Sequence, residues 1–169
     1  MTISKEAIDH LFSHARTANG FIDKPVPLSL LKEIYEIAKM GPTSMNTQPA
    51  RYVFLTTPEA KSRLIPALSP GNVDKTQSAP VSVIIATDKQ FFEHMPTVFP
   101  NNPNAKGLFE GNAALASGTA SRNGTLSGAY FMIAARALGL DCGPYHAAVA
   151  FLSLQTSSSY RCHQPQSPP

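Results

Sequence analysis

The sequence predicts one domain in which helices cover both faces of a β-sheet. With 169 residues, 43% of them hydrophobic, the chain can bury one sizeable core. Apolar residues recur at helical spacing along much of the chain, whereas residues 80–87 form an almost continuous apolar run rich in Val and Ile. Such a run is typical of a central strand that is buried on both faces, so helices are expected on either side of it.

Two amphipathic helices are predicted in the first 40 residues. Ser4 can cap the first helix, which has apolar residues on a face that is expected to pack inward: Ala7, Ile8, Leu11, Phe12 and Ala15. Pro25 and Pro27 hold the following link extended. Ser29 can cap the second helix, whose buried stripe is predicted to be Leu30, Leu31, Ile34, Ile37 and Ala38.

The end of the second helix leads into a polar loop. The helix is expected to stop after Met40, because Gly41 takes the left-handed conformation and Pro42 has no N–H to donate. The loop carries only uncharged hydroxyl and amide groups as its polar side chains: Thr43, Ser44, Asn46, Thr47 and Gln48. Composition alone favours a connector between a helix and a strand. The functional alternative is a loop that hydrogen-bonds a planar ligand with polar edges.

The middle of the chain predicts strands and helices in alternation. The expected segments are, in order, a strand at 51–57, a helix that starts at Thr57 and Pro58, a polar turn at 71–75, the central strand at 80–87, and a Pro- and Asn-rich loop at 94–107. That loop is too long for a tight connection, so it is a candidate mobile cover over a site.

A long helix is predicted over residues 113–140, where Ala and Gly are frequent and Gly139 is expected to end it. Its later part, residues 129–138, is apolar on most sides apart from Arg136. Such a helix lies either at the centre of a core or against a partner subunit.

The composition changes after Asp141. Arg161 is the only charged residue among the last 28, and 11 of the last 17 residues are Ser, Pro or Gln. A segment of this kind buries too little apolar surface to offset the entropy that ordering it costs. We therefore predict a folded domain over residues 1–152 and a disordered tail over residues 153–169.

Charge and cysteine content bear on partners and location. The net charge is +3, but the 14 Lys and Arg residues form no cluster, so neither nucleic acid nor a membrane is an expected partner. A weak preference for anionic small molecules is compatible with this charge. The first ten residues include Lys5, Glu6 and Asp9 and no apolar run, so no signal peptide is expected and a cytoplasmic location is predicted. Cys142 and Cys162 are then expected to be free thiols.

A candidate phosphate site follows the first helix. Arg16, Thr17 and Asn19 place a guanidinium, a hydroxyl and an amide together, and a guanidinium binds phosphate through two parallel hydrogen bonds. The more common alternative is a surface arginine that ends a helix, where the helix dipole favours a cation. No metal site is predicted, because no standard zinc pattern is matched by the spacing of Cys142, His146, Cys162 and His163.

Five parts of the sequence together resemble the nitroreductase superfamily. They are Ala15–Phe21, Met40–Arg51, Pro66–Asn72, Lys75 and Ala135–Pro144. Within the superfamily the sequence is most similar to the malonic semialdehyde reductase branch, which is associated with pyrimidine degradation. The resemblance covers about residues 4–144, with the motifs in the same order and at the same spacing.

This resemblance implies an α+β fold, a mixed sheet flanked by helices, in a homodimer that binds one FMN in each of two sites at the subunit interface. It implies that NADH or NADPH reduces the FMN. The acceptor of the hydride would be a small aldehyde, as in the conversion of malonic semialdehyde to 3-hydroxypropanoate, or a nitro compound. In such enzymes the flavin performs the redox chemistry, and the protein positions the reactants and stabilises charge.

The resemblance also implies roles for particular residues. Arg16 and Thr17 match positions at the phosphate and ribityl chain of FMN, whereas Asn19 stands where most of the superfamily has a second basic residue. A loop that reaches FMN, in many members from the other subunit, is matched by Pro42, Thr43, Ser44 and Asn46. Gly143 and Pro144 match the start of a loop whose backbone amides approach the flavin N5.

Asn72 and Lys75 match residues at the pyrimidine edge of the flavin. Reduction places negative charge on the N1 and C2 carbonyl region, so a lysine beside it favours the reduced form. Lys75 is therefore the candidate for an electrostatic role in catalysis. Without the resemblance, a solvated surface lysine is the expected interpretation.

The resemblance ends after Pro144. Members of the superfamily continue with strands that lead to a glycine-rich turn and to a basic residue at the phosphate, and this sequence has neither. Loss of the last strand or strands and of the C-terminal arm that crosses the dimer is expected to expose apolar surface and to weaken flavin retention. The alternative function is thus a catalytically impaired remnant that binds flavin or only forms dimers.

Overall fold

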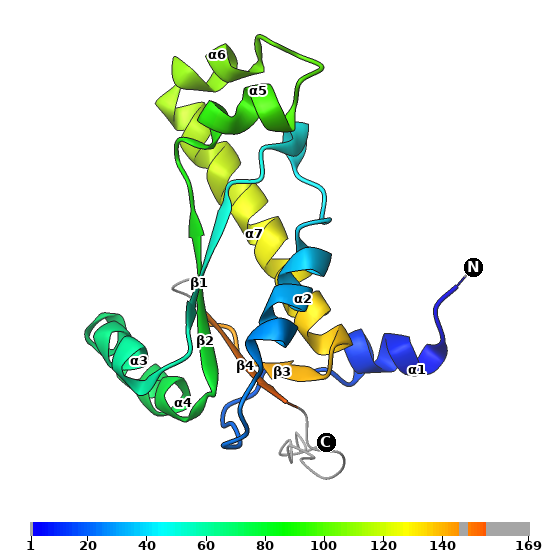
Figure 1. The fold of residues 1–169 in the computed structure, drawn as a ribbon, viewed down its shortest axis with the longest axis vertical. Helices are drawn as coiled ribbons and strands as arrows, with labels where there is room; N and C mark the ends of the chain where they lie inside the picture. Colours follow the sequence, from blue (N-terminus) through cyan, green and yellow to red (C-terminus); the bar gives the residue numbers. More distant parts are fainter. Residues whose placement is uncertain (1, 146–148, 155–169) are drawn as a thin grey trace, which may run out of the picture.

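The computed structural model describes residues 2–145 and 149–154 of the chain. At its centre is a sheet with the strand order β1-β2-β4-β3 (Figure 1). The strands are β1 (Ala50–Leu55), β2 (Val81–Thr87), β3 (Leu140–Cys142) and β4 (Val149–Leu154). All three described pairings are antiparallel, whereas the resemblance implies a mixed sheet. β4 pairs with both β2 and β3, although it lies beyond Pro144, where the resemblance ends.

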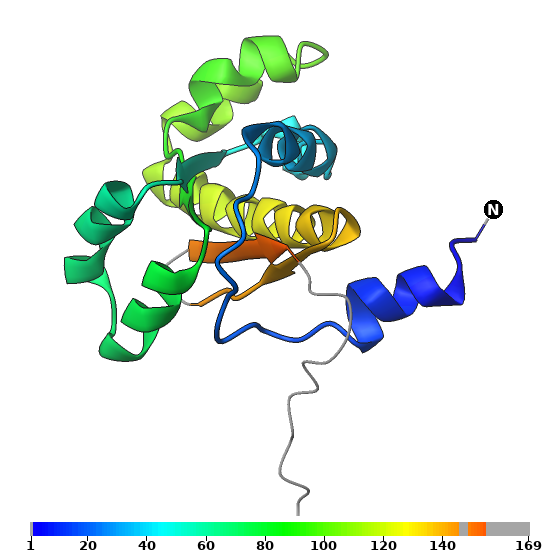
Figure 2. The same cartoon turned by 60° about the horizontal axis from the view of Figure 1, so that its bottom comes forward.

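Helices flank the sheet and extend past both ends of its long strands (Figures 1 and 2). They are α1 (Lys5–Ile8), α2 (Leu28–Ala38), α3 (Pro58–Leu64), α4 (Val73–Ser78), α5 (Met95–Val98), α6 (Ala105–Glu110) and α7 (Ala113–Ala137). α2 and α7 pack together and share the main core with the sheet. α3 and α4 lie side by side at the end of β1 and β2 that is opposite α5 and α6 (Figure 1).

The position of β2 confirms the predicted central strand. Val83 is fully buried in the main core, in one cluster with Ile34 of α2 and Phe131 of α7. The next residue, Ile84, points to the opposite face and packs against the buried Ala79. β2 therefore has apolar neighbours on both faces, as its nearly continuous apolar sequence requires.

The first helix is shorter and more exposed than predicted. Ser4 caps it as expected, with a hydrogen bond of 3.2 Å from the Ala7 amide, and a π-helical turn at Asp9–Ser13 continues it. The prediction that its apolar face packs inward is wrong, because no residue of α1 or of the turn is buried and Phe12 is 55% exposed. The π-helical turn contacts the end of α7, where the His10 side chain is hydrogen-bonded to the Arg136 carbonyl, and α1 projects away from the sheet (Figure 2).

The boundaries of α2 differ from the prediction at its start. Pro27 is the N-cap residue and no side chain caps the helix, so the prediction of Ser29 as the cap is wrong. Leu31, Ile34 and Ala38 are buried as predicted, but Ile37 is 45% exposed. The buried stripe is narrower than predicted: at about 100° per residue, Leu31, Ile34 and Ala38 share one face of the helix, and Ile37 falls at the edge of that face.

A close contact, and not a left-handed backbone, explains Gly41. The only described glycine with positive φ is Gly139, at +82°, which ends α7 as predicted. A Cβ atom on Gly41 would lie 2.5 Å from Cγ of Tyr130 in α7. Glycine is therefore needed where the end of α2 passes the tyrosine ring, and the predicted left-handed conformation of Gly41 is wrong.

Two segments predicted as irregular are largely helical. The predicted polar turn at 71–75 belongs to a 3₁₀ turn, Pro70–Asn72, and to α4. The predicted loop at 94–107 contains α5 and the start of α6, preceded by a 3₁₀ turn at Phe91–His94. α5 and α6 are stabilised by packing, because Phe91 and Phe109 are buried in a second apolar cluster with the start of α7.

Candidate functional site

The segment after the first helix lies against the end of β3. The Ala18 amide donates to the Cys142 carbonyl at 3.0 Å. Gly143 is buried at this contact, and a Cβ atom on it would lie 2.4 Å from the Ala18 carbonyl oxygen. The absence of a side chain allows the two segments to meet. Two of the predicted groups, residues 16–19 and residues 143–144, are thereby brought together from opposite ends of the sequence.

α4 brings Lys75 to the same region. Its ammonium lies 5.9 Å from the centroid of the Tyr145 ring, within the range of a cation–π interaction. Tyr145 and Phe21 both pack against the buried Ala79. Burial raises the pKa of Tyr145, and a hydrogen bond with Thr76 opposes this shift. Sequence reasoning missed Tyr145, because an aromatic residue just past a motif carries no signal of its own.

Asn72 and Lys75 lie three residues apart at the start of α4. Asn72 is the N-cap residue, but its side chain does not cap the helix, and its carbonyl accepts a hydrogen bond of 2.6 Å from the Thr76 hydroxyl. Residues three apart are neighbours on a helix surface. Lys75 is half-buried and makes no ion pair within the described part of the chain.

Arg16 is exposed and folds back on the end of its own helix. Its Nη1 donates to the carbonyls of Ser13 at 2.9 Å and of Ala15 at 2.8 Å. Arg16 thus behaves as a surface arginine that ends a helix, and these bonds use only one of its three guanidinium nitrogens. Thr17 and Asn19 are also exposed. The three polar groups predicted for phosphate are thus accessible, in the segment that contacts Gly143.

Asn123 of α7 anchors the polar loop after α2. Its Oδ1 accepts a hydrogen bond of 2.8 Å from the Ser44 amide, and its side chain is buried. The Asn46 side chain reaches in another direction and donates to the Val98 carbonyl at 2.7 Å. Sequence reasoning missed Asn123. The available signal was an amide side chain in a helix otherwise rich in Ala, Gly, Ser and Thr.

The polar loop has an unusual backbone. Met45, Asn46 and Gln48 have φ values of 51°, 52° and 39°, in the left-handed region that residues other than glycine rarely adopt. Strained backbone of this kind is concentrated at binding and catalytic sites. Thr43 supports the bend, because its Oγ1 accepts a hydrogen bond of 3.1 Å from the Gln48 amide. Within this fixed loop Ser44 is exposed, as are Pro42 and Asn46.

The predicted site residues form two groups that lie apart in one chain. The polar loop is beside α5 at one end of β1 and β2, and α4, which carries Lys75, is at the other end (Figure 1). A single chain therefore brings Lys75 and residues 143–144 together with the segment of Arg16, but it does not bring Ser44 to them.

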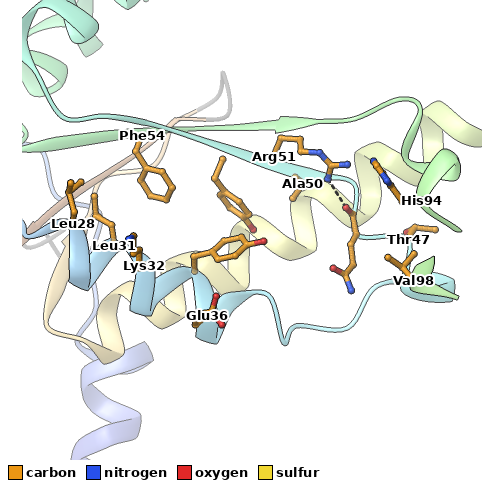
Figure 3. A pocket seen from close by; sticks show the side chains of 13 residues that line it. Leu28, Leu31, Lys32, Glu36, Thr47, Ala50, Arg51, Phe54, His94 and Val98 are labelled. Atoms are coloured by element: carbon orange, nitrogen blue, oxygen red, sulfur yellow. Dashed lines mark hydrogen bonds between the residues drawn. The ribbon is translucent and has the colours of Figure 1, made fainter. Parts of the chain in front are cut away.

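A groove of about 1050 Å³ lies between α2 and β1, behind the polar loop (Figure 3). Leu28 and Phe54 line one end, and Arg51 and His94 line the other. None of the residues predicted to bind cofactor lines this groove. Thr47 does line it, and its buried hydroxyl has no hydrogen-bond partner among the described residues. The groove is thus distinct from the cofactor residues that the sequence predicts.

Neither a metal cluster nor a membrane span occurs in residues 2–145 and 149–154. No three His, Cys, Asp or Glu side chains converge there. No helix of this part of the chain combines the length and the apolar character that crossing a bilayer requires. The metal candidates His146, Cys162 and His163, and residues 155–169 of the predicted tail, lie outside the described residues.

Comparison with known sequences gives a consistent family. The model of the nitroreductase family matches residues 12–151. A relative from Stenotrophomonas maltophilia (strain R551-3), provisionally named NADH dehydrogenase/NAD(P)H nitroreductase, is 57% identical over 82% of this chain and 70% of its own length. A relative of the same provisional name from Cupriavidus pinatubonensis is 52% identical over 83% of this chain and 73% of its own length.

Solved structures share the fold at low sequence identity. A provisionally named nitroreductase from Exiguobacterium sibiricum, in complex with FMN, has a TM-score of 0.80 at 15% identity, over 98% of this chain and 95% of that chain. The provisionally named nitroreductase ydfN from Bacillus subtilis has a TM-score of 0.79 at 20% identity, over 96% of this chain and 97% of that chain. The expected α+β fold is confirmed. By its match to the family model and by these sequence identities, the chain belongs to the nitroreductase family.

Proposed function

We propose that the chain is an NAD(P)H-dependent flavin oxidoreductase that binds FMN. The observation that carries the proposal is the meeting of residues 16–19, Lys75 and residues 143–144 around the end of β3, although they are far apart in the sequence. The comparisons agree with these cofactors. One structure of the same fold is in complex with FMN, and the names of the relatives include NADH and NAD(P)H.

The residues of this region fit FMN in charge. FMN carries an anionic phosphate, and the accessible guanidinium of Arg16 has donors left for it. Lys75 is a half-buried cation that makes no ion pair in the described residues, so its charge is available to a ligand. The close contact of Gly143 with Ala18 holds the segment of Arg16 beside residues 143–144.

The proposed roles follow from these positions. Arg16, Thr17 and Asn19 hold the phosphate and the ribityl side of the cofactor. Asn72 and Lys75 bind the pyrimidine edge, where the ammonium of Lys75 stabilises the negative charge that reduction creates. The backbone at residues 143–144 lies beside the ring. FMN, when bound, supplies the hydride chemistry, and the protein orients donor and acceptor against it.

We further propose that two copies of the chain complete each site. A second copy supplies the polar loop, so that Pro42, Thr43, Ser44 and Asn46 reach the cofactor held by the first copy. Exposed apolar side chains beside that loop favour a covered surface in the dimer: Ile37, Met40 and Tyr130. The fixed, strained backbone of the loop supports a role in binding.

The proposed acceptor is a small aldehyde or a nitro compound. For the aldehyde, the proposed reaction is the reduction of malonic semialdehyde to 3-hydroxypropanoate, because the sequence motifs are most similar to that branch. This choice rests on the five motifs taken together, among which Asn19 is typical of that branch.

Flavin spectroscopy of the full chain tests the proposal. We expect protein purified with added FMN to retain a yellow flavin spectrum and to bleach when NADH or NADPH is added without oxygen. Subsequent addition of malonic semialdehyde or of an aromatic nitro compound restores the colour if that compound is an acceptor. Retention of FMN without bleaching supports the alternative, a catalytically impaired remnant. Protein that retains no FMN contradicts both the oxidoreductase and a flavin-binding remnant, and is compatible only with a remnant that forms dimers.

A further inference from the structure

Lys61 of α3 is a buried cation in the fold. Lys61 is only 8% exposed, and no carboxylate among the described residues forms an ion pair with it. Its Nζ donates instead to two backbone carbonyls, of Gln77 at 2.8 Å and of Ala79 at 2.7 Å. Burial lowers the pKa of Lys61, and the charge of Asp23 opposes this shift.

Both carbonyls lie at the C-terminal end of α4. A helix ends with carbonyl groups that have no partner within it, and a cation there is favourable for hydrogen bonding and for the helix dipole. α4 has only six residues, so its own hydrogen bonds do not keep it helical without such support. Lys61 therefore fixes the end of α4 against α3, which lies beside it (Figure 2).

The fixed helix is the one that carries Asn72 and Lys75. The Ala79 amide donates to the Lys75 carbonyl at 3.1 Å, so the residue that Lys61 holds is bonded directly to the backbone of Lys75. At the other end of α4, the buried Thr76 donates to the Asn72 carbonyl. Two hydrogen bonds through a single residue, Ala79, thus connect the Lys61 ammonium to the Lys75 backbone.

We propose that Lys61 is a positioning residue for Lys75, which it holds in place through the end of α4 so that the Lys75 ammonium faces the flavin. The inference rests on the proposed FMN site. It assigns to the buried lysine an effect on the electronics of the cofactor, beyond its contribution to the stability of the fold.

The test compares Lys61→Met with Lys75→Met in the full chain. We expect Lys61→Met to weaken FMN binding by about tenfold and to shift the flavin midpoint potential in the same direction as Lys75→Met. In the double variant the potential is expected to equal that of Lys75→Met alone, because Lys61 acts through Lys75. Lys61→Arg, which keeps the charge, restores most of the affinity. Arg63→Met, an exposed cation on the same helix, is the matched control and leaves both quantities unchanged.

The outcomes separate this inference from the proposed function. If the unmodified chain retains no FMN, the proposed function is wrong and the inference falls with it. If the unmodified chain binds FMN, while Lys61→Met loses only thermal stability and keeps the affinity and potential, the inference alone is overturned. Should Lys61→Met not fold, Lys61→Gln is measured by the same criteria. Failure of both to fold also overturns the inference, since the role is then structural.

Discussion

Gly143 is the residue at which two parts of the proposed site leave least room for a side chain. In Gly143→Ala, the new methyl group meets the Ala18 carbonyl, a backbone atom that cannot rotate away. We expect the free energy of unfolding to fall by about 1–3 kcal/mol and residues 16–19 to shift, with weaker FMN binding. Denaturant unfolding and an FMN titration measure the two effects.

Gly107 offers the matched control for this substitution. A Cβ atom there has no neighbour within 4 Å, and the residue lies inside α6. Gly107→Ala is therefore expected to raise the free energy of unfolding by up to about 1 kcal/mol, because alanine is the better helix former. Equal stability of Gly143→Ala and the unmodified chain would contradict the close contact.

Cys142 gives a prediction about reactivity and pH. Burial raises the pKa of its thiol from 9.0 to about 12, and the charge of Arg136 opposes the shift. In a Cys162→Ser background, we expect almost no alkylation of Cys142 by iodoacetamide at about pH 8 until the chain unfolds, because the thiolate is the reactive form. Rapid alkylation of the folded protein would show that the thiol is accessible.

The same shift has a consequence for stability, whose sign follows from the two pKa values. Between pH 9.0 and about 12 the thiol of Cys142 is ionised in the unfolded chain and still protonated in the folded chain. The unfolded state then binds fewer protons, so the free energy of unfolding falls as the pH rises through this range. Cys142→Ala is expected to show a shallower decline in denaturant unfolding.

At the scale of the element, Asn123 links α7 to the polar loop. In Asn123→Ala the Ser44 amide loses its acceptor, and the hydrogen bond from the Asn123 side chain to the Thr119 carbonyl is lost as well. We expect a loss of about 1–3 kcal/mol in stability and weaker FMN binding, because the loop is no longer fixed. Faster hydrogen exchange at the Ser44 amide reports the loosened loop.

Thr125→Ala is the control for this substitution. Thr125 is exposed on the same helix, and within the described part of the chain its hydroxyl donates only to the Ser121 carbonyl of that helix, at 3.0 Å. This variant is expected to leave loop exchange and FMN binding unchanged. If Asn123→Ala behaves in the same way, the loop does not depend on α7.

The elements that could be predicted are those with a strong local signal. Thr57 and Pro58 begin α3, and the Thr57 hydroxyl accepts from the Ala60 amide at 3.2 Å. Gly139 ends α7 in the left-handed conformation. α5 and α6 could not be predicted, because they have only four and six residues beside a Pro- and Asn-rich stretch, and helices so short depend on tertiary packing.

At the scale of the whole molecule, the two separated groups of site residues predict an obligate dimer. Met40, beside the polar loop, is 77% exposed in a single chain. We expect Met40→Glu to shift the chain from dimer to monomer in light scattering and to lose FMN, because a charge in an apolar interface is costly. Arg63→Glu on α3 is the control. A dimer that is unaffected by Met40→Glu would place the interface elsewhere.

The sequence motifs located the candidate residues but not how they meet. The resemblance to the nitroreductase superfamily singled out residues 16–19, Lys75 and residues 143–144, because its motifs can be read along the sequence. Tyr145 and Lys61 were missed, since their contacts depend on how β3, α3 and α4 pack. The predicted inward face of the first helix failed for the same reason, because burial is a property of the neighbours that a segment acquires.

The left-handed backbone at Met45, Asn46 and Gln48 has a kinetic consequence. A loop already held in its bent form by Thr43 and Asn123 has little rearrangement left to make when a cofactor arrives. Mixing FMN with the protein in a stopped-flow instrument should accordingly give a single phase whose rate rises linearly with FMN concentration. A plateau at high concentration would reveal a slow change of shape.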